Sequence, residues 1–188
     1  MRGYPGSTGV ATTPGPVVLS KSDDRRAAIA VGSTPMRPPT RTPGTHELHA
    51  APISPADETA LIEFHDRCSE TTRYLRFAAA KPQLRPTEAH YLCGVDDHCR
   101  GALVIIESDD PGTIHGVGRW ERVSFREAEL AFVIEDAYQG QGLGRTLIVE
   151  TIERARDEGF TRLVTDVLPS NYRMRRLARD YDLVIAEL

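Results

Sequence analysis

The sequence predicts a mixed α/β (α+β) domain, a sandwich of helices around one β-sheet. The 188 residues are 40% hydrophobic and 27% charged, which are ordinary values for a protein that buries a core. Runs with strand-like alternation are interleaved with segments of helical period, which is typical of this fold class. A glycine-rich turn between a predicted strand and a predicted helix indicates where a ligand binds.

Residues 1–45 differ in composition from the rest of the chain. They hold seven of the thirteen prolines and six of the fifteen glycines, so burial cannot offset their ordering entropy. Their net charge is +4, whereas residues 46–188 carry −8. We expect a disordered Pro/Gly/Ser/Thr-rich tail over 1–45 and a folded domain over 46–188. A solvated extension is the favoured interpretation of the tail, and a basic arm that contacts an acidic partner or its own domain is the alternative.

The first half of the domain is predicted to be a strand followed by helices. Residues 47–53 alternate as a short strand, and Ser54, Pro55 and Asp57 then supply an N-cap, a first-turn proline and a capping-box acid. The helical period that follows brings Cys68 into the core. Residues 69–77 form a second helix, and after two prolines residues 87–92 form a short third one.

The second half is predicted to be an antiparallel meander that leads into alternating helices and strands. Turn residues separate the β-rich runs, and Gly159 ends the longest helix. The predicted elements are strands at 101–107, 113–123 and 128–135, a helix at 142–158, a strand at 162–168, a helix at 171–180 and a strand at 183–186.

The glycine-rich turn is the most informative segment of the sequence. Glycines let the backbone approach a ligand closely, and the unpaired N–H groups of a first helical turn attract an anion. The turn therefore predicts a phosphate cradle, with a tight strand-to-helix connection as the alternative. It is not a P-loop, and the acidic residue expected of a dinucleotide fold is absent. The turn consists of Gln139, Gly140, Gln141, Gly142, Leu143, Gly144 and Arg145.

Three segments of the chain resemble the GNAT family of acetyl-CoA-dependent N-acetyltransferases, and in particular the GNAT domains of bacterial protein-lysine acetyltransferases. The segments are SETTRYLRF (69–77), GALVII (101–106) and AELAFVIEDAYQGQGLG (128–144). The resemblance runs from about Glu47 to the C-terminus, and the pyrophosphate motif maps onto Gln139, Gly142 and Gly144. It implies a mostly antiparallel mixed sheet with helices on both faces and acetyl-CoA as co-substrate.

The resemblance also implies how the cofactor binds. The pantetheine arm pairs with the backbone of Phe132, Val133 and Ile134, and the phosphates bind the amides of the glycine turn. Arg145 is either a phosphate ligand or an ordinary exposed helix residue. Asn171 either hydrogen-bonds the cofactor or acceptor, or caps its helix.

Glu129 is the predicted general base. It stands in the AE-x-A context in which the bacterial lysine acetyltransferases carry a catalytic glutamate. Deprotonating an amine acceptor with a pKa near 10.4 costs roughly 4.6 kcal/mol of free energy at pH 7. A group that accepts this proton therefore accelerates the reaction. The alternative is a solvent-facing acid on a strand whose other face is core.

Two features depart from the family pattern. Ala178 stands where many members have the tyrosine that protonates the leaving thiolate, and Tyr172 and Tyr181 are weak substitutes. Asp182 and Leu183 replace the usual Gly-Phe, and the second closing strand is expected to be missing. The acceptor groove would then be open, or a second copy of the chain would complete the sheet as a homodimer.

Other ligand classes are disfavoured. His90, Cys93, His98 and Cys99 do not match zinc-site spacing, so no metal is expected. The acidic domain argues against nucleic acid, and no apolar run is long enough for a membrane span or an export signal, so a cytoplasmic location is expected. The sequence thus predicts an N-acetyltransferase of a protein lysine. The alternatives are an inactive acyl-CoA-binding or interaction module and an acetyltransferase of a small amine.

Overall fold

The computed structural model describes residues 47–186, and the predicted tail lies outside these residues. Each predicted helix and strand has a counterpart in the same order. The elements are β1 (Leu48–Pro52), η1 (Pro55–Asp57), α1 (Glu58–Arg67), α2 (Glu70–Phe77), α3 (Pro86–Cys93), β2 (Arg100–Glu107), β3 (Ile114–Ser124), β4 (Glu127–Ile134), η2 (Asp136–Tyr138), α4 (Leu143–Asp157), β5 (Arg162–Asp166), α5 (Tyr172–Asp180) and β6 (Val184–Ala186).

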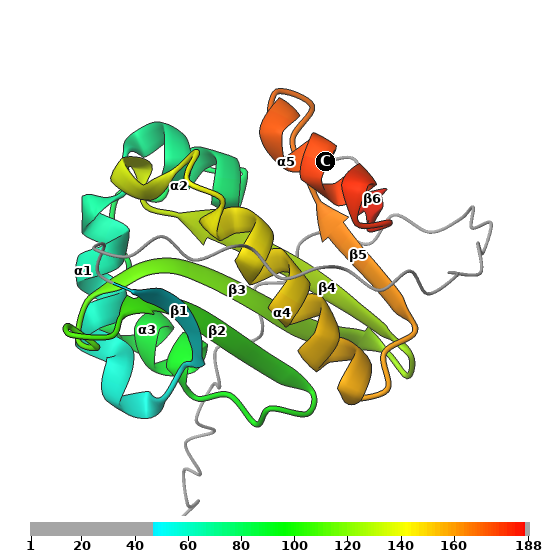
Figure 1. The fold of residues 1–188 in the computed structure, drawn as a ribbon, viewed down its shortest axis with the longest axis horizontal. Helices are drawn as coiled ribbons and strands as arrows, with labels where there is room; N and C mark the ends of the chain where they lie inside the picture. Colours follow the sequence, from blue (N-terminus) through cyan, green and yellow to red (C-terminus); the bar gives the residue numbers. More distant parts are fainter. Residues whose placement is uncertain (1–46, 187–188) are drawn as a thin grey trace, which may run out of the picture. The chain divides into compact units, whose positions relative to one another are not determined.

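The strands form one six-stranded sheet in the order β1-β2-β3-β4-β5-β6 (Figure 1). The pairs β1/β2, β2/β3 and β3/β4 are antiparallel, which confirms the predicted meander. The pairs β4/β5 and β5/β6 are parallel, since α4 and α5 carry the chain back between these strands. The mixed, mostly antiparallel sheet of the prediction is therefore confirmed.

Helices cover both faces of the sheet, as predicted. On one face, α1 and α3 bury a core that includes Leu61, Phe64 and Cys68 against β2 and β3. On the other face, α4 and α5 pack on Trp120 and Leu130 with their own apolar residues. In Figure 1, α4 runs across the front of β3 and β4. The predicted core position of Cys68 is confirmed, since the residue is buried.

Local sequence signals explain where several helices begin and end. The capping box at Ser54 is present, with its N–H donating to Asp57 Oδ2 at 2.7 Å, but the first turn is a 3-10 helix and α1 proper begins at Glu58. Asn171 caps α5 by accepting from the Met174 N–H at 3.1 Å. Gly159 follows α4 with φ of 87°, the left-handed conformation that favours glycine.

The strand β6 lies beside β5 at the edge of the described sheet. It is only three residues long and pairs with Val164, Thr165 and Asp166. Within residues 47–186 no strand follows it. That a second copy of the chain completes the sheet at this edge stays a prediction.

Candidate active site

Strand β4 separates from β5 in the middle of the sheet. The two strands pair only at their beginnings, from Glu127 with Arg162 to Glu129 with Val164. Beyond Glu129, β4 continues to Ile134 beside β3, while β5 pairs with β6. Among the residues that the structure describes, no strand pairs with the edge of β4 that faces away from β3 over its last five residues.

The main chain of this free edge carries hydrogen-bonding groups that the sheet does not use. The Glu135 N–H donates to the His115 carbonyl at 2.9 Å, so Glu135 and, by alternation, Val133 face β3. Phe132 and Ile134 consequently face the gap with their main-chain groups. The Ile134 carbonyl accepts from Gln139 Nε2 at 3.0 Å, which leaves Phe132 as the residue best presented to an extended ligand.

The glycine turn follows directly and opens helix α4. Gly140 and Gly142 have φ of 81° and 90°, and Gly142 is the N-cap of α4. A Cβ at either position would meet nothing within 4 Å, so glycine is required for backbone conformation rather than for space. Among residues 47–186, no hydrogen-bond acceptor is found for the main-chain N–H groups of 140–144. The turn therefore presents a run of unsatisfied donors at a helix N-terminus, which suits an anion.

Side chains from three elements fix the turn to α2 and α5. Gln139 Nε2 donates to Thr72 Oγ1 at 3.2 Å, and Arg173 Nη1 donates to Gln139 Oε1 at 3.1 Å. Asp136 accepts from the Ser69 N–H, the Ser69 hydroxyl and the Thr72 hydroxyl, at 2.7–2.8 Å. Partial burial opposes the shift, but these hydrogen bonds hold the pKa of Asp136 below its ordinary value. We call this set of contacts the α2 clasp.

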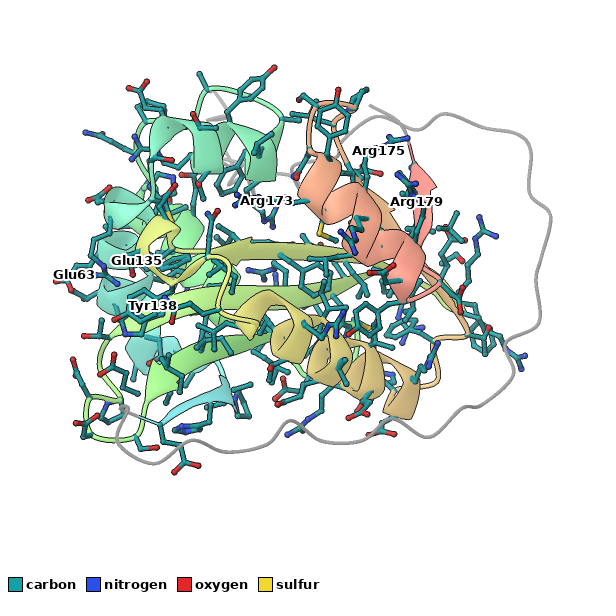
Figure 2. The ribbon with its side chains drawn as sticks, turned by 45° about the horizontal axis from the view of Figure 1, so that its top comes forward. Glu63, Glu135, Tyr138, Arg173, Arg175 and Arg179 are labelled. Carbon is teal, nitrogen blue, oxygen red and sulfur yellow. The ribbon has the colours of Figure 1, made fainter. Side chains whose placement is uncertain are left out.

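A second group of side chains anchors η2 on the other side. The Tyr138 ring stacks on the buried His115 with centroids 3.9 Å apart, and its hydroxyl donates to Glu107 at 3.1 Å. Glu135 accepts from Arg67 Nε at 3.1 Å and lies 3.2 Å from His115 Nδ1. Figure 2 shows Glu135 and Tyr138 in this part of the molecule and Arg173 on α5. The turn is thus held in place by its surroundings before any ligand binds.

Glu129 lies where β4 and β5 begin to separate. It is half-buried, and its strand neighbours are Glu121 on β3 and Val164 on β5. Burial and the nearby Asp166 raise the pKa of Glu129, with Arg76 acting in the opposite sense and Glu121 adding to the rise. Burial likewise raises the pKa of Asp166. A carboxylate with a raised pKa, placed where β4 and β5 separate, is suited to accept a proton.

The remaining predicted residues lie around the turn with differing surroundings. Arg145 is exposed in the first turn of α4, and Asn171 uses its side-chain oxygen to cap α5. Ala178 is fully buried in the core under α5, so this position is closed to solvent. Tyr172 is 78% exposed, whereas Tyr181 packs against the core, and neither is held beside Glu129 by a hydrogen bond among the described residues.

The structure adds site residues that the sequence reasoning missed. Asp166, Arg76 and Arg173 come from β5, α2 and α5, and they approach Glu129 or the turn only through tertiary folding. Asp136 contacts Ser69 and Thr72, which lie 67 and 64 residues before it in the sequence, so it too was beyond local sequence reasoning. No sequence signal marked any of the four.

These features define a class of protein. A strand that leaves its neighbour and leads through a glycine turn into a helix is suited to hold an extended, phosphate-bearing ligand along the sheet. The model of the Acetyltransferase (GNAT) family matches residues 56–181 of this chain. The chain belongs to the GNAT acetyltransferase family, and it is an N-acetyltransferase.

Two curated relatives support the assignment. An acetyltransferase of Pseudomonas aeruginosa is 30% identical over 137 residues, covering 71% of this chain and 73% of that protein. Acetyltransferase Pat of Mycolicibacterium smegmatis is 30% identical over 158 residues, covering 81% of this chain and 45% of that protein. This chain therefore spans less than half of the length of Pat.

Solved structures give the same fold. The GNAT domain of S. lividans PAT has a TM-score of 0.66 and 28% identity, over 70% of this chain and 78% of that chain. A Salmonella typhimurium protein solved with its cofactor acetyl-CoA has a TM-score of 0.58 and 20% identity, over 71% and 78%, and it supports the fold alone. These matches confirm the predicted GNAT resemblance.

Acetyl-CoA is the co-substrate of the family, and the unsatisfied amides of the turn fit its phosphates. In the part of the chain that the structure describes, no three His, Cys, Asp or Glu side chains gather where they could hold a metal ion. Within the same residues, no helix is long and apolar enough to cross a membrane.

Proposed function

We propose that this chain transfers an acetyl group from acetyl-CoA to the side-chain amine of a protein lysine, with Glu129 as the general base. The observation that carries the proposal is the position of Glu129 where β4 leaves β5, with a pKa that burial raises. A small amine is the second candidate acceptor, because the domain is acidic and attracts cations of any size.

The cofactor would lie along the free edge of β4. The pantetheine arm would lie along Phe132, Val133 and Ile134 and would meet the main chain of Phe132 and Ile134, because the main chain of Val133 faces β3. Residues 139–145 would hold the phosphates. From Glu129 to Ile134 the strand extends roughly 17 Å, at about 3.4 Å per residue. An arm laid along it would keep the thioester near Glu129 and the phosphates near the turn. Asn171 is proposed to approach the cofactor with its amide nitrogen, since its oxygen caps α5.

The chemistry needs no covalent enzyme intermediate. Glu129, directly or through a water, takes the proton from the acceptor ammonium, and the free amine attacks the thioester carbonyl. Main-chain N–H groups at the gap stabilise the oxyanion of the tetrahedral intermediate. The carbon–sulfur bond then breaks, the thiolate leaves and takes a proton from solvent, and the amide and free CoA are the products.

The experiment that tests the proposal pairs binding with turnover. Calorimetry measures acetyl-CoA and CoA binding, and thiol release is followed with a panel of lysine-containing proteins and small amines. We expect binding and acceptor-dependent thiol release. Binding without release from any acceptor would favour the interaction module, and the absence of binding would overturn both interpretations.

A further inference from the structure

A small pocket lies on the α1–α3 face of the sheet, opposite the face that α4 covers. It has a volume of about 40 Å³ and is lined by residues of α1, α2, β3 and β4. That is more room than the roughly 10–15 Å³ that a single water needs. Its lining is mostly apolar and includes the residues Arg73, Arg76 and Arg119.

Arg119 is the deepest of the three arginines. It is only 6% exposed, and its guanidinium donates to the Leu92 carbonyl at 3.3 Å. Burial, with the positive charge of Arg76 nearby, lowers the pKa of Arg119 to about 10, so the group is still charged at pH 7. A buried charge is costly unless a partner neutralises it.

Arg76 and Arg73 reach the same pocket from α2. Arg76 lies with Cζ 5.0 Å from the centroid of the Phe77 ring, and Arg73 Nη1 contacts the His65 carbonyl at 3.5 Å. Among residues 47–186, no carboxylate lies within ion-pairing distance of any of the three guanidinium groups. The pocket thus concentrates positive charge in a domain whose net charge is negative.

The pocket adjoins the proposed general base. Arg119 on β3 pairs with Ala131 on β4, two residues along the strand from Glu129, and side chains two apart share a face. Glu129 and Glu121 both act through space on Arg76. The carboxylate of Glu129 and the guanidinium groups of the arginine pocket therefore lie near one another on the same face of the sheet.

We propose that the arginine pocket binds a carboxylate of the acceptor while its amine meets Glu129. Arginine forks suit a carboxylate, which they bind through two parallel hydrogen bonds. The carboxylate could belong to a free amino acid or to an acidic residue next to a target lysine, since both present the same group. This inference rests on the proposed function for the position of the amine.

Carboxylate binding can be measured without turnover. The melting temperature is recorded with sodium propionate and with propionamide plus matched NaCl, for the wild type, Arg119→Met and the control Arg126→Met. Arg126 is an exposed arginine in the β3–β4 turn and does not line the pocket. We expect propionate to stabilise the wild type and Arg126→Met more than propionamide does, and Arg119→Met to lose the difference. Equal shifts from the two probes in the wild type would overturn the proposal.

A kinetic comparison identifies the source of the carboxylate. One pair of acceptors is L-lysine and L-lysinamide, and the other is a lysine peptide with Glu or with Gln beside the lysine. We expect kcat/KM to be at least about tenfold higher for the carboxylate member of one pair, and this ratio to fall toward one in Arg119→Met. Arg119→Lys, which retains the charge without the fork, should retain part of the ratio.

The outcomes separate this inference from the proposed function. If acetyl transfer occurs with equal kcat/KM for the two acceptors of each pair, the proposal that the pocket binds an acceptor carboxylate is overturned. The proposed acetyltransferase function is not affected by that result. No transfer to any acceptor overturns the proposed function, and the melting comparison then decides by itself whether the pocket binds a carboxylate. If Arg119→Met does not fold, Arg76→Gln, at a half-buried position on α2, takes its place in both measurements.

Discussion

The two faces of the sheet contribute to the site in different ways. On the α4 face, the glycine turn offers main-chain N–H groups, and its side chains serve mainly to hold the loop. On the α1–α3 face, the proposed chemistry would depend on side chains, with Glu129 beside Asp166 and the arginine pocket. The difference teaches that, under the proposed function, cofactor binding would depend on backbone conformation, whereas the acceptor side would depend on individual ionisable groups.

The largest effect is expected from Glu129→Gln, which removes the base and keeps the shape. We expect kcat to fall by about 10²–10⁴-fold, the usual contribution of a positioned general base. Acetyl-CoA affinity should stay within about threefold, because the cofactor contacts lie at the other end of β4. Thiol-release kinetics and calorimetry measure the two quantities, and loss of both together would contradict the division between the faces.

Gly142→Ala tests the backbone side of the comparison. Alanine at φ of 90° costs about 1–2 kcal/mol in stability, and its Cβ would project into the space where the phosphates are proposed to bind. We expect acetyl-CoA affinity to fall about tenfold or more. The matched control is Gly159→Ala, which has φ of 87° and equally open surroundings but lies at the far end of α4. An equal loss of affinity in the control would show that only stability had changed.

The pH dependence of activity tests the proposed role of Glu129 and the effect of Asp166 on its pKa. Glu129 must be deprotonated to act, and burial together with Asp166 raises its pKa, so kcat/KM should decrease on acidification at a pH above the ordinary glutamate value near 4.3. Asp166→Asn removes a neighbouring negative charge and should move this acid limb to lower pH. A limb that stays in place in Asp166→Asn would contradict the electrostatic account, and Glu129→Gln should lack the limb altogether.

The smallest effect is expected at Arg145. Its side chain is exposed, and an exposed charge–charge contact contributes about 1 kcal/mol or less. Arg145→Gln should therefore weaken acetyl-CoA binding by less than about fivefold, with a stronger dependence on salt in the wild type. A larger loss, measured by calorimetry, would mean that a side chain and not the main chain dominates phosphate binding.

Local sequence signals predicted the part of the candidate site on the α4 face. The part on the α1–α3 face depends on tertiary contacts, which the sequence does not reveal. The turn could be located from the sequence because its signals lie within some twenty residues. They are the glycines, the helical period that follows them and the alternation of β4. Glu129 was proposed as the base through its AE-x-A context, and its role stays a prediction. Arg119, Arg76 and Asp166 come together from three elements, and no spacing in the chain predicts that convergence. The separation of β4 from β5 was likewise invisible, because pairing between distant strands depends on the whole sheet.

The α2 clasp has a thermodynamic consequence. Helix α2 carries Arg73 and Arg76, and its N-cap Ser69 and its first-turn residue Thr72 hydrogen-bond Asp136. Thr72 also accepts a hydrogen bond from Gln139. If a ligand moved Gln139, these hydrogen bonds would transmit the movement to the start of α2 and hence to Arg73 and Arg76 in the lining of the arginine pocket. By linkage, the factor by which bound cofactor changes acceptor affinity equals the factor by which bound acceptor changes cofactor affinity. The size of this coupling between the two substrates would then depend on a few hydroxyl and carboxylate contacts of Ser69, Thr72 and Asp136, none of which is proposed to touch either substrate.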